Sequence, residues 1–384
     1  MTLLGYTAPR LSSAPLIVGE PGPCGCGCAL TTETSLGFAA VEFATQLLGM
    51  ELLPWQRHWL IHALELREPG RFRYKTIVTL VSRQNGKTHL LKALALFFMF
   101  MGHARLILGS AQSLDIARES WQGAVDMAAD DPELAEEIDA VRRTNGEQEL
   151  KLVNGARYRI SASTRSAGRG LSVDLLVLDE LREHRDWGAW GALTKTTLAR
   201  PNALTVCISN AGDDQSVVLN QLRATALAGS DPTVGLFEWS APEGCDLDDR
   251  EAWAQANPGL GRTITEQSLA SFLSTDPPAV FRTENLCQKV EQLDGAIDIA
   301  AWSSCRDADG TLAGVRDRVV ACVDVAPDGQ HVTCAGAALL DDGRVRIEVF
   351  GAWDSTRAAI KELFGIGDVL RDPDDPTADR GGPG

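Results

Sequence analysis

A series of short apolar runs that alternate with helical stretches is the feature that most constrains the fold. The runs are rich in Val, Leu and Ile, and the stretches between them, such as 87–100 and 113–129, carry apolar residues at helical spacing. Strands that are apolar along their whole length are buried on both faces, as in a parallel sheet covered by helices. We therefore expect an α/β fold with a mostly parallel sheet and helices on both faces. The runs are 74–82, 104–111, 156–163, 173–180 and 202–210.

The composition and pattern of the sequence change after about residue 240. Residues 241 to 316 are polar and broken by Pro and Gly, which is typical of a linker or lid of short helices. Three strand-like runs then follow, separated by "APDGQ" and "LDDGR", and Asp-Gly at such turns indicates hairpins. We predict five segments: an irregular arm (1–38), a main domain (39–240), a linker or lid (241–316), a second domain that begins with an antiparallel meander (317–371), and a disordered tail (372–384).

Composition limits the partners and the compartment. The net charge of −16 argues against a chain that wraps nucleic acid by itself, so any DNA contact must be local or shared among the subunits of a ring. No apolar run is long enough to span a bilayer, and the N-terminus lacks the pattern of a secretion signal. We expect a cytoplasmic protein without a membrane partner.

The cysteines leave two interpretations open. Nine cysteines are scattered along the chain, which does not indicate a disulfide framework. Cys24, Cys26 and Cys28 stand at every second position of "PCGCGCAL" and could hold a soft metal ion. No second Cys/His pair at zinc-finger spacing follows them, so a flexible Gly/Cys arm is the favoured interpretation.

The stretch "TLVSRQNGKTHLL" (79–91) resembles a phosphate-binding loop in its second half. Gly86, Lys87 and Thr88 match the end of G-x-x-x-x-G-K-[ST], while Val81 stands where the first glycine is usual. The context is a strand, a tight turn and a helix, so the N–H groups of residues 84 to 88 would converge on an anion. Lys87 would reach the phosphates and the Thr88 hydroxyl would bind Mg²⁺. The alternative is a surface turn.

The apolar run "LLVLDE" supplies acidic partners for that loop. Asp179 would hold the Mg²⁺ ion, and Glu180 would be the base that polarises an attacking water. The alternative is a strand that merely ends in two acids. Because the loop and the acids both follow predicted strands, the pair predicts a P-loop NTPase of the type with an additional catalytic glutamate (ASCE-type).

Other polar residues fit the same site. The Gln56 carboxamide could read an adenine edge, and Ser209 and Asn210 end an apolar strand where they could sense a γ-phosphate. Arg165 and Arg169 precede the acidic strand, where a neighbouring subunit's phosphate could meet one of them. The alternative for each arginine is a solvated loop charge.

In order, "LPWQ", "SRQNGKT", "GSAQSLDIARE", "GRGLSVDLLVLDE" and "ISNAGDD" resemble the large terminase subunit of tailed bacteriophages, over roughly residues 40 to 355. The resemblance implies a DNA-packaging ATPase that uses ATP and Mg²⁺, followed by a nuclease of ribonuclease-H-like fold. It implies as partners double-stranded DNA, the portal protein, the small terminase subunit and other copies in a ring.

By position the resemblance implies an adenine-reading Gln56, a phosphate loop, the acid Asp179, the base Glu180, and a coupling segment with Ser209 and Asn210. The loop residues are Arg83, Gln84, Asn85, Gly86, Lys87 and Thr88. Arg169 or Arg165 would act in trans, with Arg83 as the alternative in cis.

The family's nuclease begins with an acid on its first strand, where this chain has Asp324. Asp372 is a second candidate ligand for Mg²⁺ or Mn²⁺, which a two-metal nuclease holds with several carboxylates. The family's later strands and its late acid are not found here, so we expect a partial nuclease domain with little cleavage of its own. Asp324 could also be an ordinary strand acid.

Three functions remain open on the sequence. The first is a packaging ATPase that moves double-stranded DNA into an empty capsid. A helicase-like translocating ATPase is the second, although the meander after residue 316 has no place in it. The third is an inactive fragment that binds nucleotide or partners only.

Overall fold

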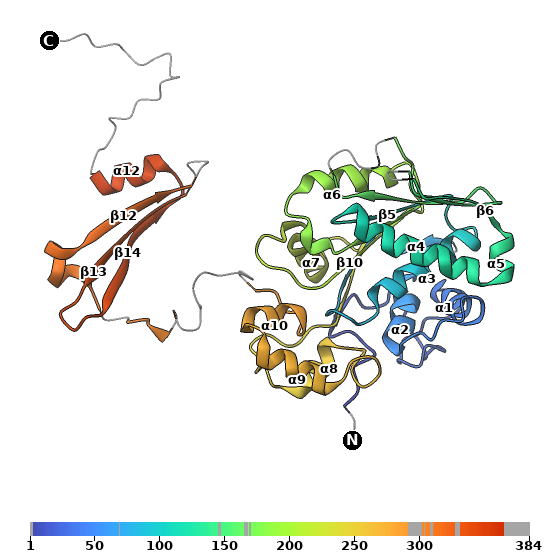
Figure 1. Cartoon of the computed structure of the whole chain (residues 1–384), viewed down its shortest axis with the longest axis horizontal. Coiled ribbons are helices and arrows are strands. Elements are labelled where there is room, and N and C mark those ends of the chain that lie inside the picture. Colours follow the sequence, from blue (N-terminus) through green and yellow to red (C-terminus); the bar gives the residue numbers. More distant parts are fainter. Residues whose placement is uncertain are drawn as a thin grey trace, which may run out of the picture. The chain divides into compact units, whose positions relative to one another are not determined.

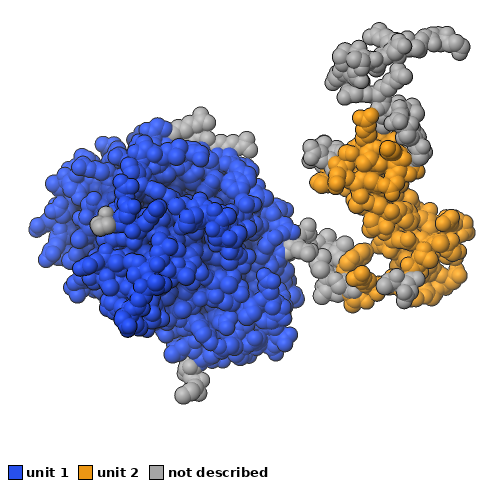
Figure 2. All heavy atoms as spheres, turned by 180° about the vertical axis from the view of Figure 1, so that it is seen from behind, with its two compact units in different colours: residues 1–294 blue, residues 295–384 orange. Residues whose placement is uncertain are grey.

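The computed structural model describes residues 3–68, 70–144, 147–164, 168, 170–290, 302, 304–307, 310–326 and 331–364. It falls into two compact units, residues 1–294 and 295–384 (Figure 2). The boundary between them lies inside the segment 241–316 that the sequence indicates as a linker or lid. Each unit is described by itself.

The first unit is built on a nine-stranded sheet (Figure 1). Its strand order is β1-β11-β4-β10-β9-β5-β8-β7-β6. The six strands from β11 to β8 are parallel, and β1, β7 and β6 are antiparallel at the two edges. The five apolar runs of the sequence are the five strands β4 (Thr76–Leu80), β5 (Leu106–Ala111), β8 (Arg157–Ala162), β9 (Leu175–Asp179) and β10 (Leu204–Ser209). The predicted mostly parallel sheet is therefore confirmed.

Helices cover both faces of this sheet, and alternate strand residues face different layers. On β9, Leu175 and Val177 belong to the larger core, whereas Leu176 and Leu178 belong to the second core. The larger core is covered by α1 (Gly37–Glu42), the π-helical turn η1 (Phe43–Leu47), α2 (Pro54–Ala63), α3 (Lys87–Phe100) and α4 (Leu114–Asp130). The second is covered by α6 (Trp187–Thr194) and α7 (Val217–Ala228).

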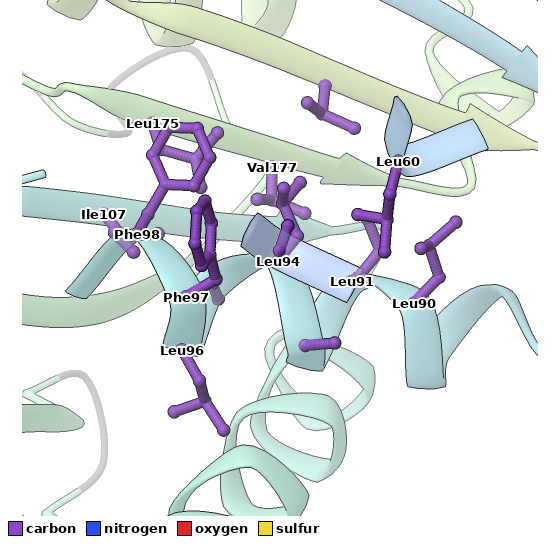
Figure 3. Packing of buried hydrophobic residues seen from close by; sticks show 14 of the residues in the cluster. Leu60, Leu90, Leu91, Leu94, Leu96, Phe97, Phe98, Ile107, Leu175 and Val177 are labelled. Carbon is purple, nitrogen blue, oxygen red and sulfur yellow. The ribbon is translucent and has the colours of Figure 1, made fainter. Parts of the chain in front are cut away.

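Helix α3 is apolar nearly all round, and ten of its residues are buried. Figure 3 shows Leu94 and Phe98 of this helix facing Val177 and Leu175 of β9. Such a helix is stable only inside a core. Among the described residues, no helix combines the length and the apolar character needed to cross a membrane.

Several elements were not predicted. A hairpin, β6 (Ile138–Arg142) and β7 (Glu149–Leu152), extends the sheet at one edge, and β11 (Val234–Glu238) lies near the other. The first residues are not wholly irregular, because β1 (Leu11–Ser12) pairs with β11. The other short elements of this unit that were not predicted are β2 (Leu66–Glu68), β3 (Arg71–Phe72), α5 (Pro132–Glu136) and the 3₁₀ turns η2 (Leu181–Glu183) and η3 (Lys195–Thr197).

A cap of three helices follows the sheet in the same unit. It consists of α8 (Arg250–Ala256), α9 (Glu266–Thr275) and α10 (Pro278–Glu284). Trp253 and Phe281 are fully buried in its own small core. We call residues 241–290 the cap.

The second unit contains the expected meander. Strands β12 (Val320–Val325), β13 (Val332–Leu339) and β14 (Val345–Trp353) form an antiparallel sheet in that order. The 3₁₀ turn η4 (Leu312–Arg318) precedes them, and α12 (Thr356–Phe364) follows.

Candidate nucleotide site

The loop between β4 and α3 has the backbone of an anion-binding turn. Gln84 and Gly86 both have left-handed backbones, with φ of 61° and 86°. Glycine adopts this conformation at no steric cost, whereas a residue such as Gln84 is rarely found there. A Cβ at Gly86 would lie 2.7 Å from the Gln56 amide nitrogen, so a larger residue would push that amide aside. The chain then enters α3 at Lys87, and the first N–H groups of a helix have no acceptor within it. The loop thus directs backbone donors and the positive end of a helix dipole to one point.

The cap holds this loop from one side. The Ser82 hydroxyl donates to the Asn257 Oδ1 at 2.6 Å, and the Gly259 N–H donates to the Asn85 Oδ1 at 2.7 Å. The Asn85 amide in turn donates to the Ser82 hydroxyl at 2.8 Å. Ser82, Asn85 and Asn257 are all buried. A fully bonded buried network of this kind keeps the loop in one conformation.

Helix α2 holds the loop from the other side. The Trp55 indole N–H donates to the Asn85 carbonyl at 3.1 Å. The Gln56 amide donates to the Gly86 carbonyl at 2.9 Å, while its oxygen accepts from the Leu53 N–H at 2.8 Å. Gln56 and Gly86 also line a cleft of about 630 Å³, together with residues such as Met50, Leu53, His89 and Arg262. This cleft beside the phosphate loop has room for a base.

Lys87 meets the acidic strand at the carboxyl edge of the sheet. Its ammonium group donates to the Val81 carbonyl at 3.2 Å and lies 3.7 Å from the Glu180 Oε1. β4 and β9 are the two parallel neighbours of β10, so the loop after β4 and the acids at the end of β9 reach the same edge. The structure thus brings together Lys87, Asp179 and Glu180, which the sequence separates by about ninety residues.

The backbone at Glu180 is also unusual. Its φ of 55° makes it, with Gln84 and Cys287, one of the described non-glycine residues with a left-handed backbone. Such conformations cost about 1–3 kcal/mol each and cluster at functional sites. Two of these residues lie in the loop and at the acid strand, which supports a functional role for this edge.

The residues present fit a divalent cation. Burial and the neighbouring charge of Glu180 raise the pKa of Asp179 to about 6, although Lys87 lowers it. A half-buried carboxylate beside a second acid is short of positive charge, and a divalent cation supplies that charge. Thr88, half-buried at the second position of α3, offers a hydroxyl on the neighbouring element. Thr88 and Asp179 provide the oxygen ligands that Mg²⁺ prefers.

Ser209 and Asn210 end the central strand β10 and are completely buried. The Ser209 hydroxyl accepts from the Arg182 N–H at 3.1 Å, and the Asn210 amide donates to the Glu284 Oε2 at 3.0 Å. Both side chains therefore bond to the residues that surround the site.

Two residues of this edge escaped prediction. Arg182 is buried and donates to the Glu284 Oε1 at 2.8 Å, while its Nε lies 3.5 Å from the Glu180 Oε2. Burial alone would lower the pKa of Arg182, but the carboxylates of Glu284, Glu180 and Glu183 raise it. Arg182 follows the acid pair by two residues, which is a weak local signal.

Glu284, at the end of α10, joins the cap to this edge. Its carboxylate also forms an ion pair with Arg83 of the loop, whose side chain is about half exposed. The same acid thus contacts the loop, the segment after β9 and the segment after β10. No sequence signal marks Glu284, since its partners lie far away in the chain.

The remaining predicted residues are not among those described at this edge. Arg165, Arg169 and Asp372 fall outside the described residues. Asp324 is exposed on β12, opposite Thr333 of β13. Within the described part of the second unit, no group of three or more acidic, His or Cys side chains gathers around it.

The large, mostly parallel sheet, with the loop and the acids at its carboxyl edge, has the architecture of the P-loop NTPase class. No known family model matches the chain. The chain is 27% identical over 240 residues to the terminase large subunit of Enterobacteria phage HK97. The aligned region covers 59% of this chain and 46% of that protein. The match thus spans less than half of the relative's length. The crystal structure of the HK97 large terminase has a TM-score of 0.59 at 22% identity and covers 82% of this chain and 67% of its own.

In sequence and in fold, the chain is therefore similar to the large terminase subunits of phages. The resemblance inferred from the motifs is confirmed. The P-loop NTPase fold, predicted from the loop and the acids that follow the apolar runs, is confirmed with it.

Proposed function

We propose that this chain is the ATPase subunit of a phage DNA-packaging motor, which hydrolyses ATP to move double-stranded DNA into a procapsid. The observation that carries the proposal is the meeting of Lys87, Asp179 and Glu180 beside the anion-binding loop. The similarity to large terminase subunits supports the choice of packaging over other uses of ATP.

Each residue then has a role that its position supports. The N–H groups of the loop and the Lys87 ammonium bind the phosphates, and Gln56 contacts the base in the cleft beside Gly86. Mg²⁺, held by Thr88 and Asp179, would neutralise the charge that develops on the phosphates. Glu180 accepts a proton from the attacking water. Its contacts with Lys87 and Arg182 orient the carboxylate.

The network around Glu284 is the proposed route from hydrolysis to movement. Arg182 touches Glu180 and Glu284, and Asn210 also bonds to Glu284. A change of charge at Glu180 therefore acts through Arg182 on Glu284, which belongs to the cap. Because the cap and the segment after β10 share that one carboxylate, they respond together.

The partners follow from the same proposal. A chain with a net charge of −16 would contact DNA through local basic groups inside a ring of copies docked on the portal. The small terminase subunit would deliver the DNA, and the host cytoplasm would be the site of assembly. Arg169 or Arg165 would stabilise the transition state of a neighbour, and Arg83 would do so in cis if neither does.

Substitution Glu180→Gln tests the proposal, because it preserves shape and removes the base. We expect nucleotide binding to persist and Mg²⁺-dependent ATP hydrolysis to fall by about 10²–10⁴-fold. Glu137→Gln is the matched control, since it makes the same chemical change at an exposed carboxylate outside the network of Arg182 and Glu284, and it should retain most of the turnover. Wild-type turnover in Glu180→Gln would contradict the assignment, and no hydrolysis by the unmodified chain with DNA and portal would favour an inactive fragment.

The helicase-like alternative is not favoured, because the similarity is to terminase subunits and the meander follows the ATPase fold. Measurement of strand separation on a forked duplex distinguishes the two. A packaging ATPase leaves the duplex paired.

A further inference from the structure

The three closely spaced cysteines meet a histidine from another element. The Nε2 of His62 lies 3.3 Å from the Cys26 Sγ and 3.8 Å from the Cys24 Sγ. One ligand atom from each of Cys24, Cys26, Cys28 and His62 can be chosen so that all four lie within 4.8 Å of one another. His62 stands near the end of α2, more than thirty residues after the cysteines. The chain therefore offers three thiols and one imidazole at a single point.

The glycines between the cysteines explain how the thiols come together. An extended chain would separate Cys24 from Cys28 by about 13 Å. Gly25 and Gly27 instead have φ of 80° and 89°, left-handed values that glycine tolerates and other residues avoid. The Gly22 N–H also donates to the Cys28 carbonyl at 2.6 Å, which closes the loop. The alternation of Cys and Gly is thus a compact ligand loop.

The cluster is held against the main core of the first unit. Leu30, just after the loop, is fully buried, and Cys24 and Cys28 pack against the same core. His62 is buried and stacks on His58, one turn earlier in α2, with 4.0 Å between the ring centroids. Both sides of the cluster are therefore fixed before any ion binds.

We propose that Cys24, Cys26, Cys28 and His62 bind a structural Zn²⁺ ion. Three cysteines and one histidine are a common ligand set of closed, tetrahedral zinc sites. With Zn–S of about 2.3 Å and Zn–N of about 2.0 Å, a tetrahedron separates sulfur from nitrogen by about 3.5 Å. The two sulfur–nitrogen distances here, 3.3 and 3.8 Å, lie on either side of that value. Soft thiolates favour Zn²⁺ over Mg²⁺ or Ca²⁺, and protons are released from the thiols as the ion binds.

The ion would tie the N-terminal arm to α2. The other end of that helix carries Trp55 and Gln56, which bond to the phosphate loop. The zinc site would therefore fix the helix on which these two contacts depend. This site does not require the ATPase proposal to hold, because its ligands lie apart from the loop and the acids.

The metal content of the purified full chain tests the proposal. Protein prepared under reducing conditions should contain about one zinc per chain by plasma mass spectrometry. Cys26→Ser and His62→Gln should lose most of it, whereas His62→Cys should retain it. Cys322→Ser and His331→Gln, which change an exposed cysteine and an exposed histidine of the second unit, should keep the wild-type content.

Cobalt gives a second readout that needs no variant to fold. Wild-type chain loaded with Co²⁺ should show the intense visible bands of a tetrahedral ion and a thiolate charge-transfer band. Circular dichroism of each variant separates metal loss from unfolding. The proposal is overturned if wild-type protein takes up neither Zn²⁺ nor Co²⁺, or if Cys26→Ser and His62→Gln bind as much zinc as wild type. It is also overturned if the purified protein contains an iron–sulfur cluster. A disulfide among the three cysteines in reduced preparations would overturn it too.

Discussion

The two units place their acidic residues in different ways. In the first unit, parallel strands end at one edge, so the loop after β4, the acids at the end of β9 and the buried Ser209 and Asn210 at the end of β10 gather there. In the second unit, the strands run antiparallel, and Asp324 lies along β12 opposite Thr333. A parallel sheet concentrates the ends of its strands, whereas a meander spreads its polar side chains along an exposed face. Topology, rather than the number of acids, therefore decides where a site forms.

Among the predictions that compare the two units, the largest effect is expected at Lys87, the cation at the carboxyl edge of the first sheet. Lys87→Ala removes a charge that faces both the loop and Glu180, so ATP hydrolysis should fall by about 10²–10³-fold and nucleotide affinity should drop. A steady-state phosphate-release assay measures the loss. Lys151→Ala, which breaks an exposed pair with Asp139 on the edge hairpin, should change neither quantity. Equal activity in the two variants would place the phosphates elsewhere.

The next effect concerns Glu284, which connects the cap to the edge. Glu284→Gln keeps the shape and removes a charge that pairs with buried Arg182, so unfolding should become easier by about 1–3 kcal/mol. Thermal denaturation measures this, and turnover should also fall. Asp341→Asn is the comparison in the second unit, where the pair with Arg318 is exposed and should contribute nothing measurable. A larger loss for Asp341→Asn would reverse the contrast between the units.

A smaller effect is expected at Asn257, which bonds to Ser82 under the phosphate loop. Asn257→Ala should loosen the loop and weaken nucleotide binding about tenfold, or about 1.4 kcal/mol. Titration calorimetry with a non-hydrolysable nucleotide gives the affinity. Asn202→Ala is the control, because Asn202 holds a turn before β10, away from the site. That variant should lose stability and keep its affinity; a loss of affinity in both would mean a global effect.

The smallest effect should come from Asp324. Asp324→Asn replaces an exposed acid in the second unit, so ATP hydrolysis should stay at the wild-type level. Metal-dependent cleavage of plasmid DNA, if the purified protein shows any, should decrease in the same variant. A fall in ATP hydrolysis would show that the two units work as one.

Local patterns predicted much of the first unit. Apolar runs and helical periodicity depend only on neighbouring residues, so β4, β5, β8, β9 and β10 and the helices α3 and α4 were predicted. The phosphate loop and the acids Asp179 and Glu180 were visible for the same reason, since each is a short motif at the end of a strand. The hairpin of β6 and β7 was missed because its strands are short and mixed in polarity.

Contacts between distant segments were decided by the tertiary structure alone. The carboxylate of Glu284 meets Arg83, Arg182 and Asn210 only because α10 packs back on the sheet edge. The sequence favours a flexible arm for the three cysteines, whereas the structure places His62 of α2 beside them. Sequence spacing carries no information on such pairs, because a side chain's partners are set by the packing of whole elements. The sequence by itself determined the strands, the loop and the acids of this protein, and the fold decided which residues surround them.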